Sequence, residues 1–163
     1  MAARRKTAAA DEPPVLPGHI CQAIAEGRLD DAIAAYRAAA KRWPESSMTL
    51  NALGYTLADR TEEYREAEKF IRKALKYDPD SPAIIDSLGW VLHKLGRHEE
   101  ALVELRRAYE GFDDPEVAAH IVEVLDALGR HDEALAFLES AEEKRPDSKL
   151  LEDVRKRLFA ESP

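Results

Sequence analysis

The chain has few of the residues on which several classes of function depend. Its single cysteine in 163 residues excludes an internal disulfide and any zinc site built from several cysteines. Its seven glycines are scattered singly, so the sequence contains no glycine-rich phosphate-binding loop. No apolar run approaches the roughly 20 residues that a membrane-spanning helix requires, and we therefore expect no membrane insertion.

Positive charge is also scarce. The chain has 24 Lys and Arg against 32 Asp and Glu, which gives a formal net charge of -8. Nucleic acids and anionic lipid surfaces attract basic proteins, so we expect neither as a partner. The basic cluster at residues 4–6 is not followed by the apolar segment of a secretory signal. We therefore expect a cytoplasmic protein, and a periplasmic one only if the native N-terminus is missing.

Alanine, in contrast, recurs at a regular interval. An acidic residue followed by alanine stands at residues 31–32, 66–67, 100–101 and 133–134, an interval of 33 to 35 residues. A large side chain follows each alanine after four residues, and another alanine follows after seven. The preceding half of units two to four carries apolar residues three and four apart. This spacing predicts two amphipathic helices in each unit.

Residues that begin and end helices occur between these segments. A serine or aspartate before a proline predicts a capped helix start at Ser81 and at Asp114. A glycine with positive φ is typical of a helix end, which we predict at Gly27, Gly96 and Gly129. The second unit has no glycine at this turn.

Together these features resemble the tetratricopeptide repeat, a helix-turn-helix unit of 34 residues. The resemblance covers residues 17–146 and implies an all-α, right-handed superhelical solenoid of about four repeats. We divide it into a degenerate unit at 17–46 and units at 47–81, 82–114 and 115–146. Residues 147–160 predict a C-terminal capping helix with an apolar stripe of Leu151, Val154 and Leu158. Residues 1–16 show no periodicity and predict a disordered tail.

The sequence contains no arrangement typical of catalysis, and we predict no enzyme activity, no metal and no cofactor. Cys21 lies near His19, but no third residue is in place to orient a nucleophilic pair. The histidines do not combine helical spacing with a third ligand. They are His19, His93, His98, His120 and His131.

The resemblance also implies a concave groove, lined by the first helix of each unit, that holds a segment of a partner protein. Asn51 matches part of a clamp for a C-terminal carboxylate found in some members, but Pro17 and Cys21 stand where its other residues would be. Two aromatic side chains among acidic ones favour an apolar or basic segment. Alternatively, Tyr55 and Trp90 pack between neighbouring helices. The candidate partner-binding residues are Asn51, Tyr55, Asp59, Asp86, Trp90, His93, Glu123 and Asp126.

A narrower resemblance concerns residues 50–61, 86–91 and 114–120. They are similar to the last repeats of large envelope-associated bacterial tetratricopeptide proteins, some of which serve as adaptors for a periplasmic processing protease. We therefore predict a non-catalytic protein-interaction module. The alternatives are an assembly protein that forms a homo-oligomer through its end repeats or terminal helix, and a regulatory subunit of an enzyme.

Overall fold

The computed structural model describes residues 18–160, and in this range all regular secondary structure is helical. The predicted tail at residues 1–16 lies outside the described range. The helices in order are α1 (Gly18–Ala25), α2 (Leu29–Arg42), α3 (Ser47–Arg60), α4 (Tyr64–Tyr77), α5 (Pro82–Lys94), α6 (His98–Gly111), α7 (Pro115–Ala127), α8 (His131–Lys144) and α9 (Lys149–Phe159).

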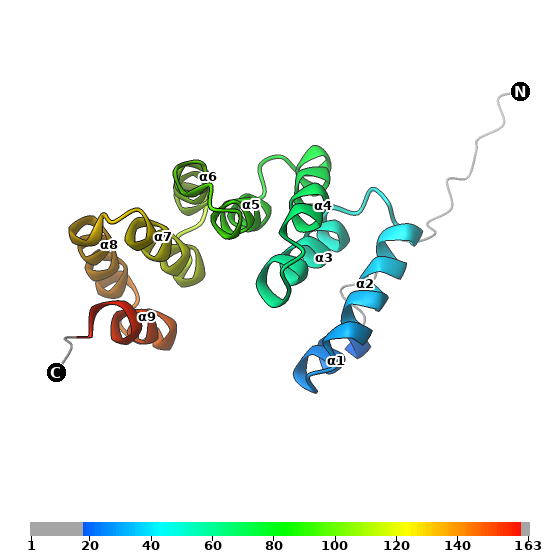
Figure 1. The fold of residues 1–163 in the computed structure, drawn as a ribbon, viewed down its shortest axis with the longest axis horizontal. Coiled ribbons are helices and arrows are strands. Elements are labelled where there is room, and N and C mark those ends of the chain that lie inside the picture. Colours follow the sequence, from blue (N-terminus) through cyan, green and yellow to red (C-terminus); the bar gives the residue numbers. More distant parts are fainter. Residues whose placement is uncertain (1–17, 161–163) are drawn as a thin grey trace, which may run out of the picture.

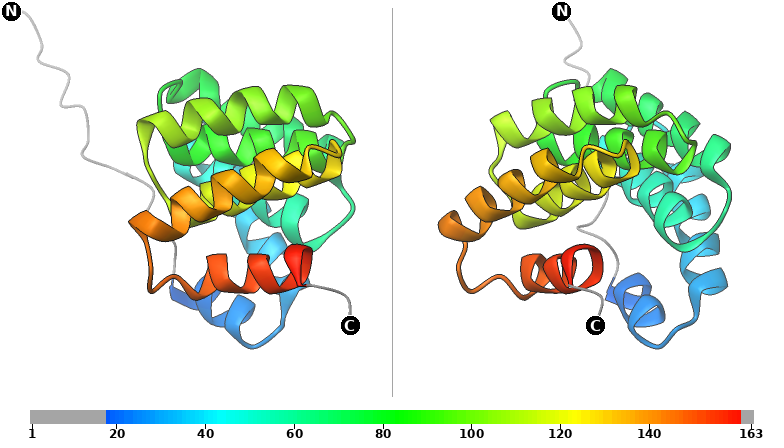
Figure 2. Two further views of the ribbon diagram at one scale, coloured as in Figure 1. Left: turned by 90° about the vertical axis from the view of Figure 1, so that its left-hand side faces the viewer. Right: turned by 60° about the vertical axis from the view of Figure 1, so that its left-hand side comes forward.

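The helices pack as successive pairs that follow one another along an arch (Figure 1). In the pairs α3–α4, α5–α6 and α7–α8 the first helix lies on the inner side of the arch and the second on the outer side. The two further views show α1 and α9 at the two ends of this arch (Figure 2). The predicted fold class, an all-α solenoid of helix-turn-helix repeats, is confirmed.

Small residues bring the two helices of each unit close together. Ala67, Ala101 and Ala134 are fully buried. A Cβ atom added to Gly89 would lie 2.5 Å from Cγ of Leu105, so only glycine permits this approach of α5 to α6. In the preceding pair, a Cβ atom added to Gly54 would clash with the side chain of Ile71 in the same way. The fourth unit has Val122 at the equivalent position, and its two helices share a less extensive contact.

Three of the helix ends carry the predicted glycines in the left-handed region. Their φ angles are 73° at Gly27, 77° at Gly96 and 72° at Gly129. In the second unit Thr61 ends the helix without positive φ. Its hydroxyl donates to the carbonyl oxygen of Leu57 (2.7 Å) and accepts from the backbone N–H of Glu63 (3.0 Å), which satisfies groups left open at the helix end.

The starts of the helices agree with the sequence in all but one respect. The side chain of Asp114 accepts from the backbone N–H of Glu116, as predicted. Ser46 and Ser148 cap α3 and α9 in the same way. Ser81, which precedes Pro82, makes no side-chain capping bond. At this position the proline, whose φ is already suited to the first helical residue, begins the helix by itself.

The last helix, α9, contacts both helices of the preceding pair. Leu151 and Val154 are buried against them and Leu158 is half-buried, as the apolar stripe predicted. Arg157 of α9 pairs with Glu123 of α7 at 2.6 Å, and Arg155 pairs with Glu142 of α8 at 2.6 Å. Helix α9 is therefore held to the arch by both apolar and charged contacts.

Candidate functional site

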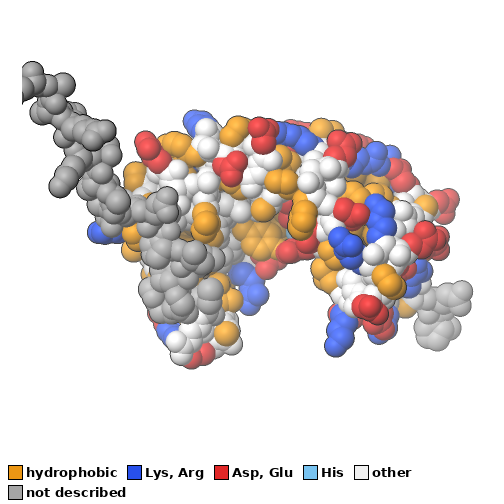
Figure 3. Space-filling view, turned by 180° about the vertical axis from the view of Figure 1, so that it is seen from behind, with side chains coloured by type: hydrophobic (Ala, Val, Ile, Leu, Met, Phe, Trp, Pro, Cys, Tyr) orange, Lys and Arg blue, Asp and Glu red, His pale blue; other side chains and the backbone are white. Residues whose placement is uncertain are grey.

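The inner side of the arch has two neighbouring hollows. The first hollow lies among α3, α5 and the start of α7, and the second lies between α3 and the α1–α2 turn. Ala52 and Tyr55 of α3 line both, so the hollows adjoin at these two residues. A space-filling view shows the arch hollowed between its two ends, with hydrophobic and acidic side chains at the back of the hollow and basic ones at its sides (Figure 3).

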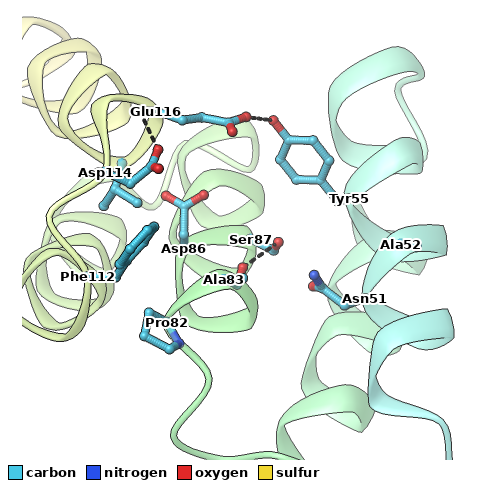
Figure 4. A pocket seen from close by; sticks show the side chains of 11 residues that line it. Asn51, Ala52, Tyr55, Pro82, Ala83, Asp86, Ser87, Phe112, Asp114 and Glu116 are labelled. Atoms are coloured by element: carbon cyan, nitrogen blue, oxygen red, sulfur yellow. Dashed lines mark hydrogen bonds between the residues drawn. The ribbon is translucent and has the colours of Figure 1, made fainter. Parts of the chain in front are cut away.

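The first hollow has a cavity volume of about 280 Å³. Its walls are apolar at Pro82, Phe112 and Val117, and three carboxylates, those of Asp86, Asp114 and Glu116, also line it (Figure 4). No lysine or arginine is among its lining residues. Phe112 is 58% exposed, which is unusual for a phenylalanine and leaves its ring open to the hollow.

One hydrogen bond spans the mouth of the first hollow. The Tyr55 hydroxyl of α3 donates to Oε1 of Glu116 of α7 over 2.7 Å, although the residues lie 61 positions apart (Figure 4). Burial and the Glu116 carboxylate both raise the pKa of Tyr55, so its hydroxyl stays protonated and keeps donating. The bridge connects the first helices of units two and four.

Asn51 and Asp59 lie on the same helix as Tyr55, one on each side of it along the sequence. Asn51 lines the first hollow, and its Oδ1 atom is buried without a hydrogen-bond partner. Asp59 is exposed and lines the second hollow together with Arg60. The second hollow, of about 290 Å³, is otherwise mostly apolar, with Ile24, Leu29 and Tyr36 among its lining residues.

Trp90 does not line the hollows and packs between neighbouring helices, which was the alternative left open by the sequence. It is 6% exposed and packs between α5 and α7, where its ring stacks on His120 with centroids 4.2 Å apart. His93 stacks on the same ring at 5.3 Å, and Nζ of Lys94 lies 4.3 Å from the ring centroid. Of the two aromatic residues, only Tyr55 thus lines the hollows.

Asp86 and His120 form a buried pair beneath the first hollow. Nδ1 of His120 lies 2.8 Å from Oδ1 of Asp86, and both residues are 6% exposed. Burial opposes protonation of His120, but the hydrogen bond to Asp86 and the negative charges of Asp86, Glu116 and Glu123 together raise the pKa of the imidazole. The pair joins the first helices of units three and four, so Asp86 is less available to a partner than its sequence position indicated.

The remaining candidates are already engaged within the protein. Nδ1 of His93 lies 3.0 Å from Nδ1 of His98, and burial, together with His98, lowers the pKa of His93 to about 4. Glu123 pairs with Arg157 of the terminal helix. Asp126 lies 2.8 Å from Nδ1 of His131. These acidic residues stabilise contacts between elements.

Sequence reasoning missed Phe112, Asp114 and Glu116 as groove residues. They lie in the loop before α7 and at its start, where the repeat pattern assigns no groove position. The available signal was Pro115, which stands two places later than the equivalent prolines of the other units. The shift places Pro115 at the first residue of α7, and the preceding loop of residues 112–114 is one residue shorter than the loop of residues 78–81 before α5.

Within residues 18–160, no three His, Cys, Asp or Glu side chains are grouped so that they could hold a metal ion. In the same range, no helix is both long and apolar enough to cross a membrane.

An arch of helix pairs with a hollowed inner face defines a helical-repeat solenoid. The chain belongs to the tetratricopeptide repeat family, because a sequence model of this family matches residues 55–152 and a second one matches residues 19–82.

Known proteins support this assignment. Over 82 residues, half of this chain, the sequence is 52% identical to the TPR repeat-containing protein PA4667 of Pseudomonas aeruginosa. The match takes in 14% of the length of that protein. Among solved structures, TTC0263, a thermophilic TPR protein of Thermus thermophilus, matches with a TM-score of 0.73 and 23% identity over 85% of this chain and 75% of that chain. A crystal structure of MamA matches with a TM-score of 0.66 and 22% identity over 86% and 85%. At these identities both structures show the fold alone.

Proposed function

We propose that the protein is a non-catalytic interaction module that holds a segment of a partner protein on its concave face. Tetratricopeptide repeats commonly serve as scaffolds for protein–protein interaction, and the family assignment supports this general role. We further propose which surface of the protein binds the partner and which kind of segment it binds.

The observation that carries the proposal is the pair of adjoining hollows on the inner face. An exposed phenylalanine beside a cavity is costly in water and is typical of a binding surface. Two cavities that meet at Ala52 and Tyr55 suit successive side chains of one bound segment. The acidic lining of the first hollow favours a segment that is basic as well as apolar.

The eight candidate residues divide into three groups in this proposal. Asn51, Tyr55 and Asp59 contact the partner directly, because all three line the hollows. Asp86 lies at the hollow but is held by His120. The others support the shape of the groove through contacts within the chain: Trp90, His93, Glu123 and Asp126.

Selection from a random peptide library displayed on phage tests this function. We expect the full chain to enrich related peptides, and Ala52→Trp to abolish their binding because the indole would fill the meeting point of the hollows. Ala136→Trp is the matched control, since Ala136 is exposed on α8 and lines neither hollow. Circular dichroism verifies that both variants stay folded. Enriched peptides that bind wild type and Ala52→Trp equally would contradict the groove as the site.

A second candidate function is self-assembly through the terminal helix. Leu150 on α9 is 43% exposed beside the buried Leu151, which leaves an apolar side chain at the end of the solenoid. Light scattering over a range of concentrations tests this alternative. A mass that increases with concentration, and that Leu150→Glu returns to the monomer value, would favour assembly. A constant monomer mass would exclude it.

A further inference from the structure

We propose that the first hollow is a subsite for the side chain of an arginine in the bound segment. This inference rests on the function proposed above and specifies its partner chemistry.

The first hollow offers hydrogen-bond acceptors with little competition from donors. Glu116 accepts from Tyr55 through Oε1, and Asp114 accepts from the Glu116 backbone through Oδ1. A carboxylate has about four lone-pair sites, so each retains capacity for a further donor. A ligand that supplies several donors and no acceptor fits this set.

The charges around the cavity favour a cation. Its lining residues include three carboxylates and no lysine or arginine. His120 compensates one of these carboxylates, that of Asp86, from the α7 side. The start of α7 contributes partial positive charge through its backbone N–H groups, and one of these is already bonded to Asp114. Asp114 and Glu116 are therefore the carboxylates with charge to offer a ligand.

The apolar walls distinguish arginine from lysine. A guanidinium group stacks on aromatic rings and is less strongly hydrated than an ammonium group, whereas lysine is a compact, hydrated point charge. Phe112 provides an exposed ring, and Pro82 and Val117 provide surface for the aliphatic stem. The cavity volume of about 280 Å³ has room for one such side chain.

Other occupants fit the first hollow less well. An acidic side chain would meet carboxylates of its own sign. An apolar side chain would remove water from these carboxylates without replacing its hydrogen bonds, which costs free energy. The five N–H donors of arginine address these acceptors directly.

Titration of the full chain with small probes, followed by NMR, tests the subsite independently of any partner. The probes are N-acetyl-arginine amide, the corresponding lysine amide and the neutral citrulline amide. We expect arginine amide to shift the backbone signals of Ala83, Phe112 and Val117 in a saturable way. Lysine amide should bind several-fold more weakly, and citrulline amide should give no saturable shift.

Two variants locate the charge requirement. Glu116→Gln and Asp114→Asn should each weaken arginine amide binding about threefold or more, because each removes one carboxylate from the cavity. Asparagine also caps helices well, so Asp114→Asn preserves the start of α7. Asp132→Asn, on the exposed start of α8, should bind like wild type. Equal binding of arginine and citrulline amides, or unchanged binding by both groove variants, would overturn the subsite.

The outcome separates this inference from the proposed function. If the phage library yields groove-dependent peptides without arginine and arginine amide does not bind, the groove function stands and the subsite is wrong. If the lining signals shift when residues 1–16 are removed, the occupant is the chain's own Arg4 or Arg5, and the partner arginine is overturned. If the signals shift with protein concentration, the occupant is a second copy of the chain, and the partner arginine is again overturned.

Discussion

Ala101 shows how one side chain sets the distance between two helices. Its side chain is fully buried in α6, and its carbonyl oxygen lies 3.2 Å from the point where a Cβ at Gly89 would be. The two small residues thus face each other across the α5–α6 contact. A larger side chain at either position has no free volume to enter.

We expect Ala101→Leu to lower the free energy of unfolding by roughly 1–3 kcal/mol, because three added carbon atoms would overpack this contact. Urea denaturation measures the change. Ala136→Leu, on the exposed face of α8, is the control and should stay within about 0.5 kcal/mol of wild type. An Ala101→Leu protein as stable as wild type would show that the two helices can separate without cost.

His93 and His120 should affect stability in opposite pH ranges. Burial and His98 lower the pKa of His93 to about 4 from 6.5, so the unfolded chain binds this proton more readily and stability falls as the pH drops from 6.5 to 4. The pKa of His120 is raised despite its burial, because Asp86 favours the protonated form. Its contribution is complete below pH 6.5 and is lost as the pH rises through the folded-state pKa.

We therefore expect His93→Gln to reduce the loss of stability between pH 6.5 and 4, and His120→Gln to reduce the loss above pH 6.5. Urea unfolding at a series of pH values measures both slopes against wild type. Identical slopes in wild type and His93→Gln would contradict the effect assigned to burial.

At the scale of elements, α9 covers the apolar surface of the last pair of helices. Adjacent leucines on this helix have opposite environments, since Leu151 is fully buried and Leu150 is 43% exposed. The contact of α9 with α7 and α8 therefore depends on one side of the helix.

We expect Leu151→Ala to destabilise the protein by about 2–5 kcal/mol through the cavity it leaves, or to release α9 locally at a lower cost. Leu150→Ala, one residue away, should cost much less. Hydrogen exchange of the α9 amides reports local release of this helix, and urea unfolding reports the stability of the whole protein. Together they distinguish the two outcomes. Similar effects of the two substitutions would mean that α9 does not use this face.

At the scale of the whole molecule, stability is distributed along the arch. In a solenoid each unit contacts mainly its neighbours, so central units have support on both sides and end units on one. The pair α5–α6 is central, whereas α1, with eight residues, is at one end.

Amide hydrogen exchange should therefore be slowest in α5 and α6 and fastest in α1 and α2, because the end unit opens without disturbing the centre. Mass spectrometry of peptic fragments measures this order. Equal exchange rates along the chain would indicate that the arch opens only as a single cooperative unit.

The helices, their order and most of their ends could be predicted from the sequence, because they depend on interactions within one repeat. The spacing of Ala67, Ala101 and Ala134 and the glycines at positive φ are local requirements that recur with the period. The solenoid follows, since each amphipathic pair must bury its apolar face against the next.

Only the tertiary structure decided which candidate residues face the groove. Trp90 is buried under Lys94 and against His120, while Phe112, which directly follows the end of α6, is exposed at the first hollow. Tyr55 meets Glu116 across two units, a contact between residues 61 positions apart. The physical reason is that these placements depend on the angles at which successive units stack. Those angles result from many side-chain volumes acting together, and no single repeat contains them.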